Sequence, residues 1–172
     1  MKQRITFAIT VAVLAGCAGT TPVAVPAALD PPAGEALALI VPARGVQIYE
    51  CRARNDGNGG EWAFVAPDAE LFDSRGNRLG RHGAGPMWEA QDGSRVVGTV
   101  RARADAPVAG AVPWLLLTAK SSGSDGTLSR VTSIQRVNTV GGAAPVAPCT
   151  REAFGTSMRI DYTADYYFFA AR

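Results

Sequence analysis

The sequence contains few of the side chains that most often carry chemistry: its 172 residues include one histidine, three cysteines and two lysines. Without residues 1–16, which hold Lys2 and Arg4, the count is 15 basic against 15 acidic side chains. A neutral chain lacks the clustered, uncompensated cations that bind phosphates, so we expect no nucleic-acid partner. A single histidine argues against a zinc or copper site, and we expect neither a metal nor a cofactor.

Complete catalytic motifs are missing as well. The chain has no Gly-x-Ser-x-Gly turn of the kind that presents a hydrolase nucleophile, and the serines of 122–126 have the wrong spacing. The glycine-rich run 56–60 lacks the Lys-Ser/Thr ending of a phosphate-binding loop. These absences leave the reaction, if there is one, undefined.

The N-terminal apolar run, Ile5 to Leu14, is about ten residues long, whereas a membrane-spanning helix needs about 20. Basic residues precede it and small residues follow it, as in a secretion signal. Leu14-Ala-Gly-Cys17 resembles the bacterial lipobox, in which the signal is cut just before a cysteine that is then acylated. A conventional secretion signal that happens to contain a cysteine is the alternative.

These features predict three segments: a lipoprotein signal peptide at 1–16, a lipid-anchored tether at 17–34 and a folded domain at 35–172. Lipid on Cys17 would make the membrane a partner and would hold the protein in the bacterial cell envelope, facing the periplasm. Ala18, rather than Asp, after that cysteine favours the outer membrane. Four prolines and few large apolar side chains in 18–34 predict a flexible spacer.

The two remaining cysteines, Cys51 and Cys149, lie in a chain expected to enter an oxidising compartment. An even number of cysteines there favours a disulfide. Neither has a second cysteine or a histidine at metal-ligand spacing, so a metal site is the weaker interpretation.

The folded part shows short runs of β-branched, aliphatic and aromatic residues between Gly, Pro, Asn and Asp clusters. This rhythm predicts an all-β domain, a single antiparallel β-sandwich or a closed β-barrel of about ten short strands. The expected strands are 36–41, 46–53, 62–66, 69–73, 87–90, 95–104, 114–120, 129–137, 158–162 and 165–170.

Alternation along these strands predicts which side chains face inward. Tyr49 and Cys51 share one face of their strand, and a disulfide would turn that face inward. Arg101 and Arg103 share the solvent face of theirs. The run 113–118 is apolar on both faces, which predicts a strand buried on both sides.

Several blocks, taken in order, resemble an uncharacterised family of secreted proteins, the domain of unknown function 3455 family. These blocks are 46–51, 62–67, 70–73, 80–90, 112–117, 134–142 and 164–169. The resemblance runs from about Glu35 to the C terminus and implies no established activity. It leads us to expect a bulkier residue, often Tyr, where this chain has Gly83, so a site lined by that position would be more open here.

The densest block, 81–89, contains the only histidine. His82 could act as an acid, a base or a binding donor with Trp88 and Glu89 beside it, and nearby glycines would let the backbone approach a ligand closely. The alternative is a histidine that bonds a backbone carbonyl and fixes a hairpin.

The block 134–142 supplies two further candidates. Arg136 and Asn138 could hydrogen-bond a carboxylate or a sugar. The alternative is a polar strand end whose arginine pairs with an acid such as Asp165. The aromatic residues near the C terminus and the three tryptophans could line a pocket, although core packing explains most of them equally well.

We therefore expect a cell-envelope lipoprotein that acts as a small-molecule-binding or structural module, with a small-molecule ligand or an envelope protein as its partner. The alternative is a hydrolase-like enzyme in which His82 and Glu89 transfer protons and Arg136 orients an anionic group. A structure that places these side chains around one concavity would favour the enzyme.

Overall fold

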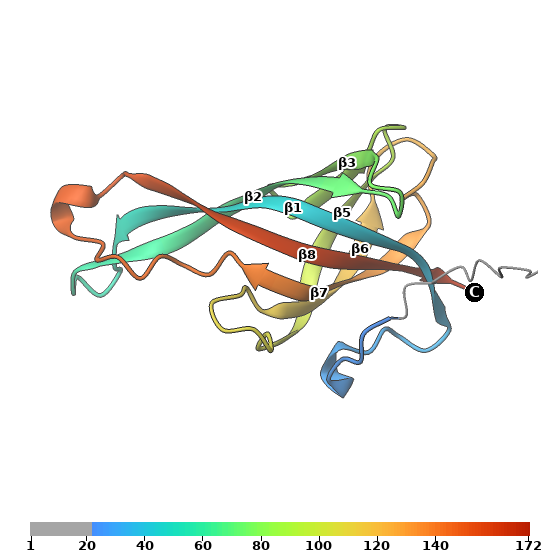
Figure 1. The fold of residues 1–172 in the computed structure, drawn as a ribbon, viewed down its shortest axis with the longest axis horizontal. Coiled ribbons are helices and arrows are strands. Elements are labelled where there is room, and N and C mark those ends of the chain that lie inside the picture. Colours follow the sequence, from blue (N-terminus) through green and yellow to red (C-terminus); the bar gives the residue numbers. More distant parts are fainter. Residues whose placement is uncertain (1–21) are drawn as a thin grey trace, which may run out of the picture.

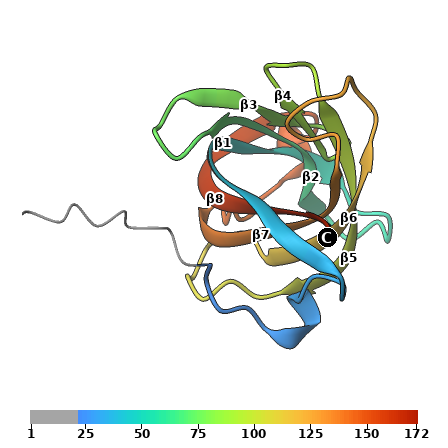
Figure 2. The same cartoon turned by 90° about the vertical axis from the view of Figure 1, so that its right-hand side faces the viewer.

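Eight antiparallel strands make up the fold of residues 22–172, the part of the chain that the computed structural model describes. They are β1 (Glu35–Ala53), β2 (Gly60–Phe72), β3 (Arg78–Gly83), β4 (Met87–Ala90), β5 (Arg95–Ala104), β6 (Trp114–Ser121), β7 (Val131–Gly141) and β8 (Ser157–Ala171). Each strand pairs with the next in the sequence, and β8 pairs with β1 to close a barrel (Figures 1 and 2). The all-β prediction is confirmed, and of its two alternatives the barrel is the one observed.

Three pairs of expected strands are continuous, which reduces the ten to seven, and one strand that was not expected, β3, brings the count to eight. The runs 36–41 and 46–53 lie in β1, 62–66 and 69–73 in β2, and 158–162 and 165–170 in β8. The residues between these runs, 42–45, 67–68 and 163–164, pair with β1, β2 or β8 in regular register, so the strands do not end there. β3 was not predicted, since its sequence RLGRHG has two glycines and no β-branched residue.

Two 3-10 turns, η1 (Ala27–Leu29) and η2 (Arg151–Ala153), are the helical elements of the described chain. None of the helices within residues 22–172 is long and apolar enough to span a membrane. The predicted signal peptide and the predicted lipidation residue, Cys17, lie outside the described residues.

The residues just before β1 pack against the outside of the barrel. Leu29 is fully buried, and its carbonyl oxygen accepts a hydrogen bond of 2.7 Å from Nε2 of Gln135. The backbone N–H of Val23 donates to the hydroxyl of Tyr167 at 3.2 Å. The composition predicted a flexible spacer here. Residues 22–34 nevertheless contact the barrel, because the outer faces of β6 and β8 offer apolar side chains for Leu29 to cover.

This contact explains why neighbouring strands are buried on both faces. Trp114 and Leu116 of β6 pack into the outer cluster under Leu29, whereas Leu117 belongs to the inner core. The prediction of a doubly buried strand at 113–118 is thereby confirmed for β6. The same sorting holds in β8, where Tyr167 lies in the outer cluster and Tyr166 in the inner one.

The hairpin of β3 and β4 is much shorter than the strands on either side of it. β2 pairs with β3 only from Ala69 onward, and β4 pairs with β5 only as far as Val97. Residues 60–68 of β2 and 99–104 of β5 therefore have no strand partner on the side of this hairpin within the described chain. The barrel wall is interrupted beyond the tip of the hairpin.

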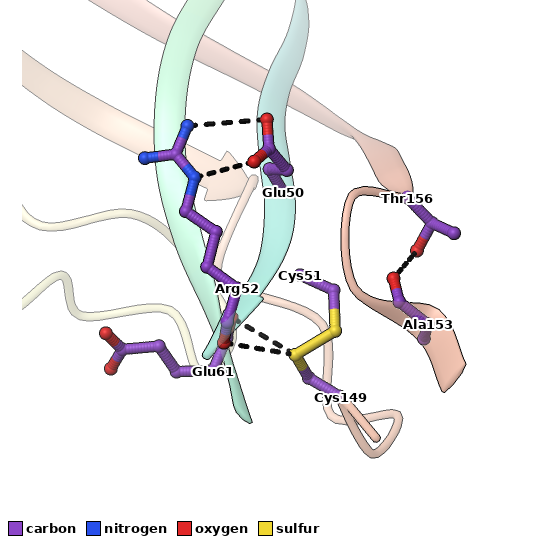
Figure 3. A network of polar contacts seen from close by, with 7 residues as sticks. All are labelled: Glu50, Cys51, Arg52, Glu61, Cys149, Ala153 and Thr156. Carbon is purple, nitrogen blue, oxygen red and sulfur yellow. Dashed lines mark hydrogen bonds and ion pairs between the residues drawn. A yellow bond between two sulfur atoms is a disulfide. The ribbon is translucent and has the colours of Figure 1, made fainter. Parts of the chain in front are cut away.

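At one end of the molecule, β1, β2 and β8 continue past the shorter strands (Figure 1). The predicted disulfide joins Cys51 of β1 to Cys149, with 5.4 Å between the Cα atoms, and it pins the segment between β7 and β8 to this extension (Figure 3). Tyr49 and Cys51 are both buried, as predicted. The backbone N–H of Cys51 also donates to the carbonyl of Thr156 at 2.9 Å.

Replacing both Cys51 and Cys149 with Ser should lower the free energy of unfolding by about 2–5 kcal/mol. The bond closes a loop across a separation of 98 residues, and long loops gain the most from closure. Urea unfolding of the mature chain measures the loss. Intact-mass analysis of the secreted protein should show two fewer hydrogens than after reduction, and free thiols at both positions would contradict the assignment.

Candidate functional site

A cavity of about 410 Å³ lies inside the barrel beside the interrupted wall. Strands β2 to β8 all contribute to it, together with the β3–β4 tip and the segment before β6. Its lining consists of Phe64, Val65, Pro67, His82, Gly85, Pro86, Trp88, Val100, Arg103, Pro113, Leu115, Leu117, Arg136 and Tyr166. Most of these side chains are apolar or aromatic, as in the sites that bind small organic molecules.

The mouth of this cavity is formed by the unpaired stretches of β2 and β5. Phe64 and Val65 of β2 are 52% and 44% exposed, and Val100 of β5 is 50% exposed. Trp88 and Leu117 are each 1% exposed and lie in the interior. The lining thus runs from a solvent-facing apolar rim to a buried core wall.

His82 lies in the cavity wall and is only 3% exposed. Its Nδ1 is 2.9 Å from the carbonyl oxygen of Met87, which can only accept, so Nδ1 carries the proton. The ring stacks on Trp88 at 4.3 Å between centroids and meets the Tyr166 ring edge-on at 5.0 Å. Burial, aided by the positive charge of Arg136, lowers the pKa of His82 to about 3 although the Met87 hydrogen bond opposes it, and the imidazole is neutral at neutral pH.

Trp88 is placed by the pairing of β3 with β4, which sets it directly opposite His82. A Cβ at Gly98 of β5 would lie 2.9 Å from Cζ3 of the indole, so only glycine allows this close approach. Trp88 also packs edge-on against Tyr166 and Phe168. This aromatic cluster holds the His82 ring in one orientation.

Glu89 lies outside the barrel, since successive residues of a strand point to opposite faces. Its carboxylate forms ion pairs with Arg81, the residue opposite it on β3, and with Arg95 of β5. It does not line the cavity. His82 and Glu89 are therefore on opposite sides of one sheet, and the structure does not assemble the acid–base pair that the enzyme hypothesis requires.

Arg136 of β7 is half-buried and lines the cavity. Its Nε and Nη2 donate to the carbonyl oxygen of Pro113 at 3.1 and 2.8 Å. The ion pairs recorded for residues 22–172 do not include it. The expected alternative partner, Asp165, instead accepts a hydrogen bond of 2.8 Å from Asn138.

Asn138 is exposed and lies outside the cavity. Its φ of 51° is the only positive value among the non-glycine residues described, and it coincides with the register shift between Val137 and Val140. Asparagine tolerates this left-handed conformation better than most residues, so its role at this position is to shape the strand.

Arg103 is a cavity residue that the sequence did not indicate. Strict alternation placed Arg101 and Arg103 on one solvent-facing side of β5, and both are exposed as predicted. A register shift between Val100 and Ala102 breaks that alternation, so Val100 and Arg103 both line the cavity while Ala102 packs into the outer cluster. The local sequence of β5 contains no pattern from which this register shift could be predicted.

Of the sequence candidates, His82, Trp88 and Arg136 share the cavity, whereas Glu89 and Asn138 do not. The C-terminal aromatic residues divide between the two packing clusters, and of the aromatic candidates only Tyr166 and Trp88 line the cavity within the described chain. Gly83 leaves open space, because a Cβ there would meet only the end of the Met87 side chain at 3.9 Å. Across residues 22–172, no three His, Cys, Asp or Glu side chains are grouped closely enough to hold a metal ion.

The family model for the protein of unknown function family (DUF3455) matches residues 32–170, so the chain belongs to this family. The match covers the barrel except for the last residue of β8 and includes every cavity residue. No curated protein and no solved structure gives a significant match to the chain.

The buried His82 should make the stability of the protein fall in mild acid. Its folded pKa of about 3 lies below the unfolded value of about 6.5, so its contribution is complete above pH 6.5 and is lost as the pH falls toward 3. Between about pH 7.5 and about pH 4.5 the loss from this group should be about 2–3 kcal/mol.

Urea unfolding at these two pH values, compared with the variant His82→Phe, measures the effect. The phenylalanine keeps an aromatic ring against Trp88 but cannot bind a proton, so its stability should change less. Equal pH dependence in the two proteins would show that His82 does not titrate with a lowered pKa.

Proposed function

We propose that this protein is a binding protein of the bacterial cell envelope that holds one small molecule inside its barrel. The observation that carries the proposal is the cavity of about 410 Å³ behind the short hairpin of β3 and β4. An eight-stranded barrel has room either to fill its interior with side chains or to hold one small ligand. Here side chains fill one part of the interior, and the cavity occupies the part beside the unpaired stretches of β2 and β5.

The lining favours binding over catalysis. Aromatic and aliphatic side chains make up most of the lining, with Trp88 and Leu117 buried in the core and Phe64 at the rim. His82 is a weak base at neutral pH, and the nearest candidate acid, Glu89, lies on the outer face. A ligand with an apolar body fits this environment.

The neutral dye N-phenyl-naphthylamine should bind to the mature chain with one site per molecule and with increased fluorescence. Replacing Val100 at the mouth with Trp should weaken binding by about tenfold or more, since the larger ring would fill the entrance. Fluorescence titration measures both affinities.

Val97→Trp is the matched control. Val97 is an exposed valine of the same strand that does not line the cavity, so its variant should bind the dye as the wild type does. Failure of the wild type to bind, or equal weakening by both substitutions, would overturn the proposal.

The envelope location rests on the lipobox-like sequence that ends at Cys17. In a bacterial host, metabolic labelling with palmitate should mark the wild-type protein, and Cys17→Ser should remove the label and release the protein from the membrane fraction. Cys149→Ser, which alters a disulfide cysteine, should keep the label. Membrane association and labelling that survive the loss of Cys17 would contradict the anchor.

A further inference from the structure

The cavity carries positive charge and no negative charge. Arg136 lies in its wall and Arg103 also lines it, whereas no Asp or Glu from residues 22–172 takes part in the lining. The other titratable side chains of the lining are His82 and Tyr166. Burial lowers the pKa of the first and raises that of the second, so both are neutral at neutral pH.

The surroundings of Arg136 extend this picture. Its charge acts on Tyr49, Tyr162 and Tyr166, whose pKa values are all raised, primarily by burial. None of these phenols supplies a counter-ion at neutral pH. A half-buried guanidinium among aromatic rings is costly unless it is paired, and the carbonyl of Pro113 provides only a neutral acceptor.

The guanidinium of Arg136 also has N–H groups that do not bond to Pro113. An arginine has five N–H groups, and the two hydrogen bonds to the Pro113 oxygen use one on Nε and one on Nη2. The remaining N–H groups belong to Nη1 and Nη2, which have the neutral hydroxyl of Tyr166 as a further neighbour. Together they present the fork that suits the two oxygens of a carboxylate. The bonds to Pro113 hold this fork in place before any ligand arrives.

We propose that the ligand of this barrel is a small organic acid, with an apolar or aromatic body and one carboxylate or sulfonate group that pairs with Arg136. This inference rests on the proposed binding function and specifies the class of ligand. The apolar body lies against Trp88 and Leu117, and the anion neutralises the cavity charge. Arg136 is the binding residue, and Arg103 adds attraction for anions.

Two dyes with the same ring skeleton test the proposal. N-phenyl-naphthylamine is neutral, and anilinonaphthalene sulfonate adds one sulfonate to it. The wild type should bind the sulfonated dye about tenfold or more tightly than the neutral one, because a charge-assisted hydrogen bond is added inside an apolar site. This comparison needs no variant, so it stands even if a substitution disturbs folding.

Arg136→Gln should weaken the sulfonated dye by about tenfold to a hundredfold and leave the neutral dye within about threefold. Arg136→Lys keeps the charge and should retain part of the preference. Arg101→Gln is the matched control, since it removes one exposed cation from β5 outside the cavity and should change the preference by less than about threefold. Circular dichroism and thermal unfolding establish that each variant is folded.

The outcomes separate this inference from the proposed function. If the neutral dye binds and the sulfonated dye gains nothing, the anionic ligand is refuted while the binding barrel stands. If Arg136→Gln leaves the preference intact, recognition by Arg136 is refuted, and loss of the preference in Arg103→Gln would assign it to the other cavity arginine. If neither dye binds the wild type, the proposed function itself fails.

Discussion

The length mismatch between neighbouring strands is the constraint on which the cavity depends. β4 has four residues and β3 has six, yet they stand between β2 with 13 and β5 with 10. Two strands can hydrogen-bond only along the length of the shorter one, so β2 and β5 have no partner on this side beyond the end of the β3–β4 hairpin. The side chains of β6, β7 and β8 on the far side of the barrel then become the back wall of a space that solvent can reach.

In the same hairpin, the alternation of side chains between the two faces separates charged residues from aromatic ones. Arg81 and Glu89 face outward and pair with each other, while their sequence neighbours His82 and Trp88 stack inside. Charge is thereby kept on the wet surface of this part of the wall. Arg136, on the opposite side of the barrel, is an exception, because it lines the cavity and takes part in none of the ion pairs of the described residues.

Much of the fold could be predicted from the sequence, because alternating apolar residues and glycine-rich turns are local signals. The pairing of Cys51 with Cys149 was predictable for a different reason, because these are the two cysteines that remain once Cys17 is assigned to the lipobox. The number of strands was not, since residues such as Pro42, Gly45 and Pro67, which local patterns treat as breaks, are paired within continuous strands. The barrel, rather than a sandwich, follows from pairing between β1 and β8, which are far apart in the sequence.

The site was predictable only in part. His82, Trp88 and Arg136 carried recognisable chemistry. Glu89 was wrongly grouped with His82, because Trp88 is the residue that pairs with His82 and faces inward, and Glu89, the next residue of β4, faces outward. Arg103 depends on a register shift in β5 that has no local signature. Asn138 drew attention as a polar residue, although its value lies in the backbone conformation that it tolerates.

The packing of residues 22–34 on the outside of the barrel changes how far the domain could move from an anchor at Cys17. A free spacer over 18–34 could reach about 50 Å, but only residues 18–21 separate Cys17 from Pro22, where the described chain begins. Five residue steps span at most about 17 Å, which is less than the width of a small domain. If Cys17 carries the predicted lipid, the barrel would therefore be held close to the lipid headgroups rather than at the end of a long tether.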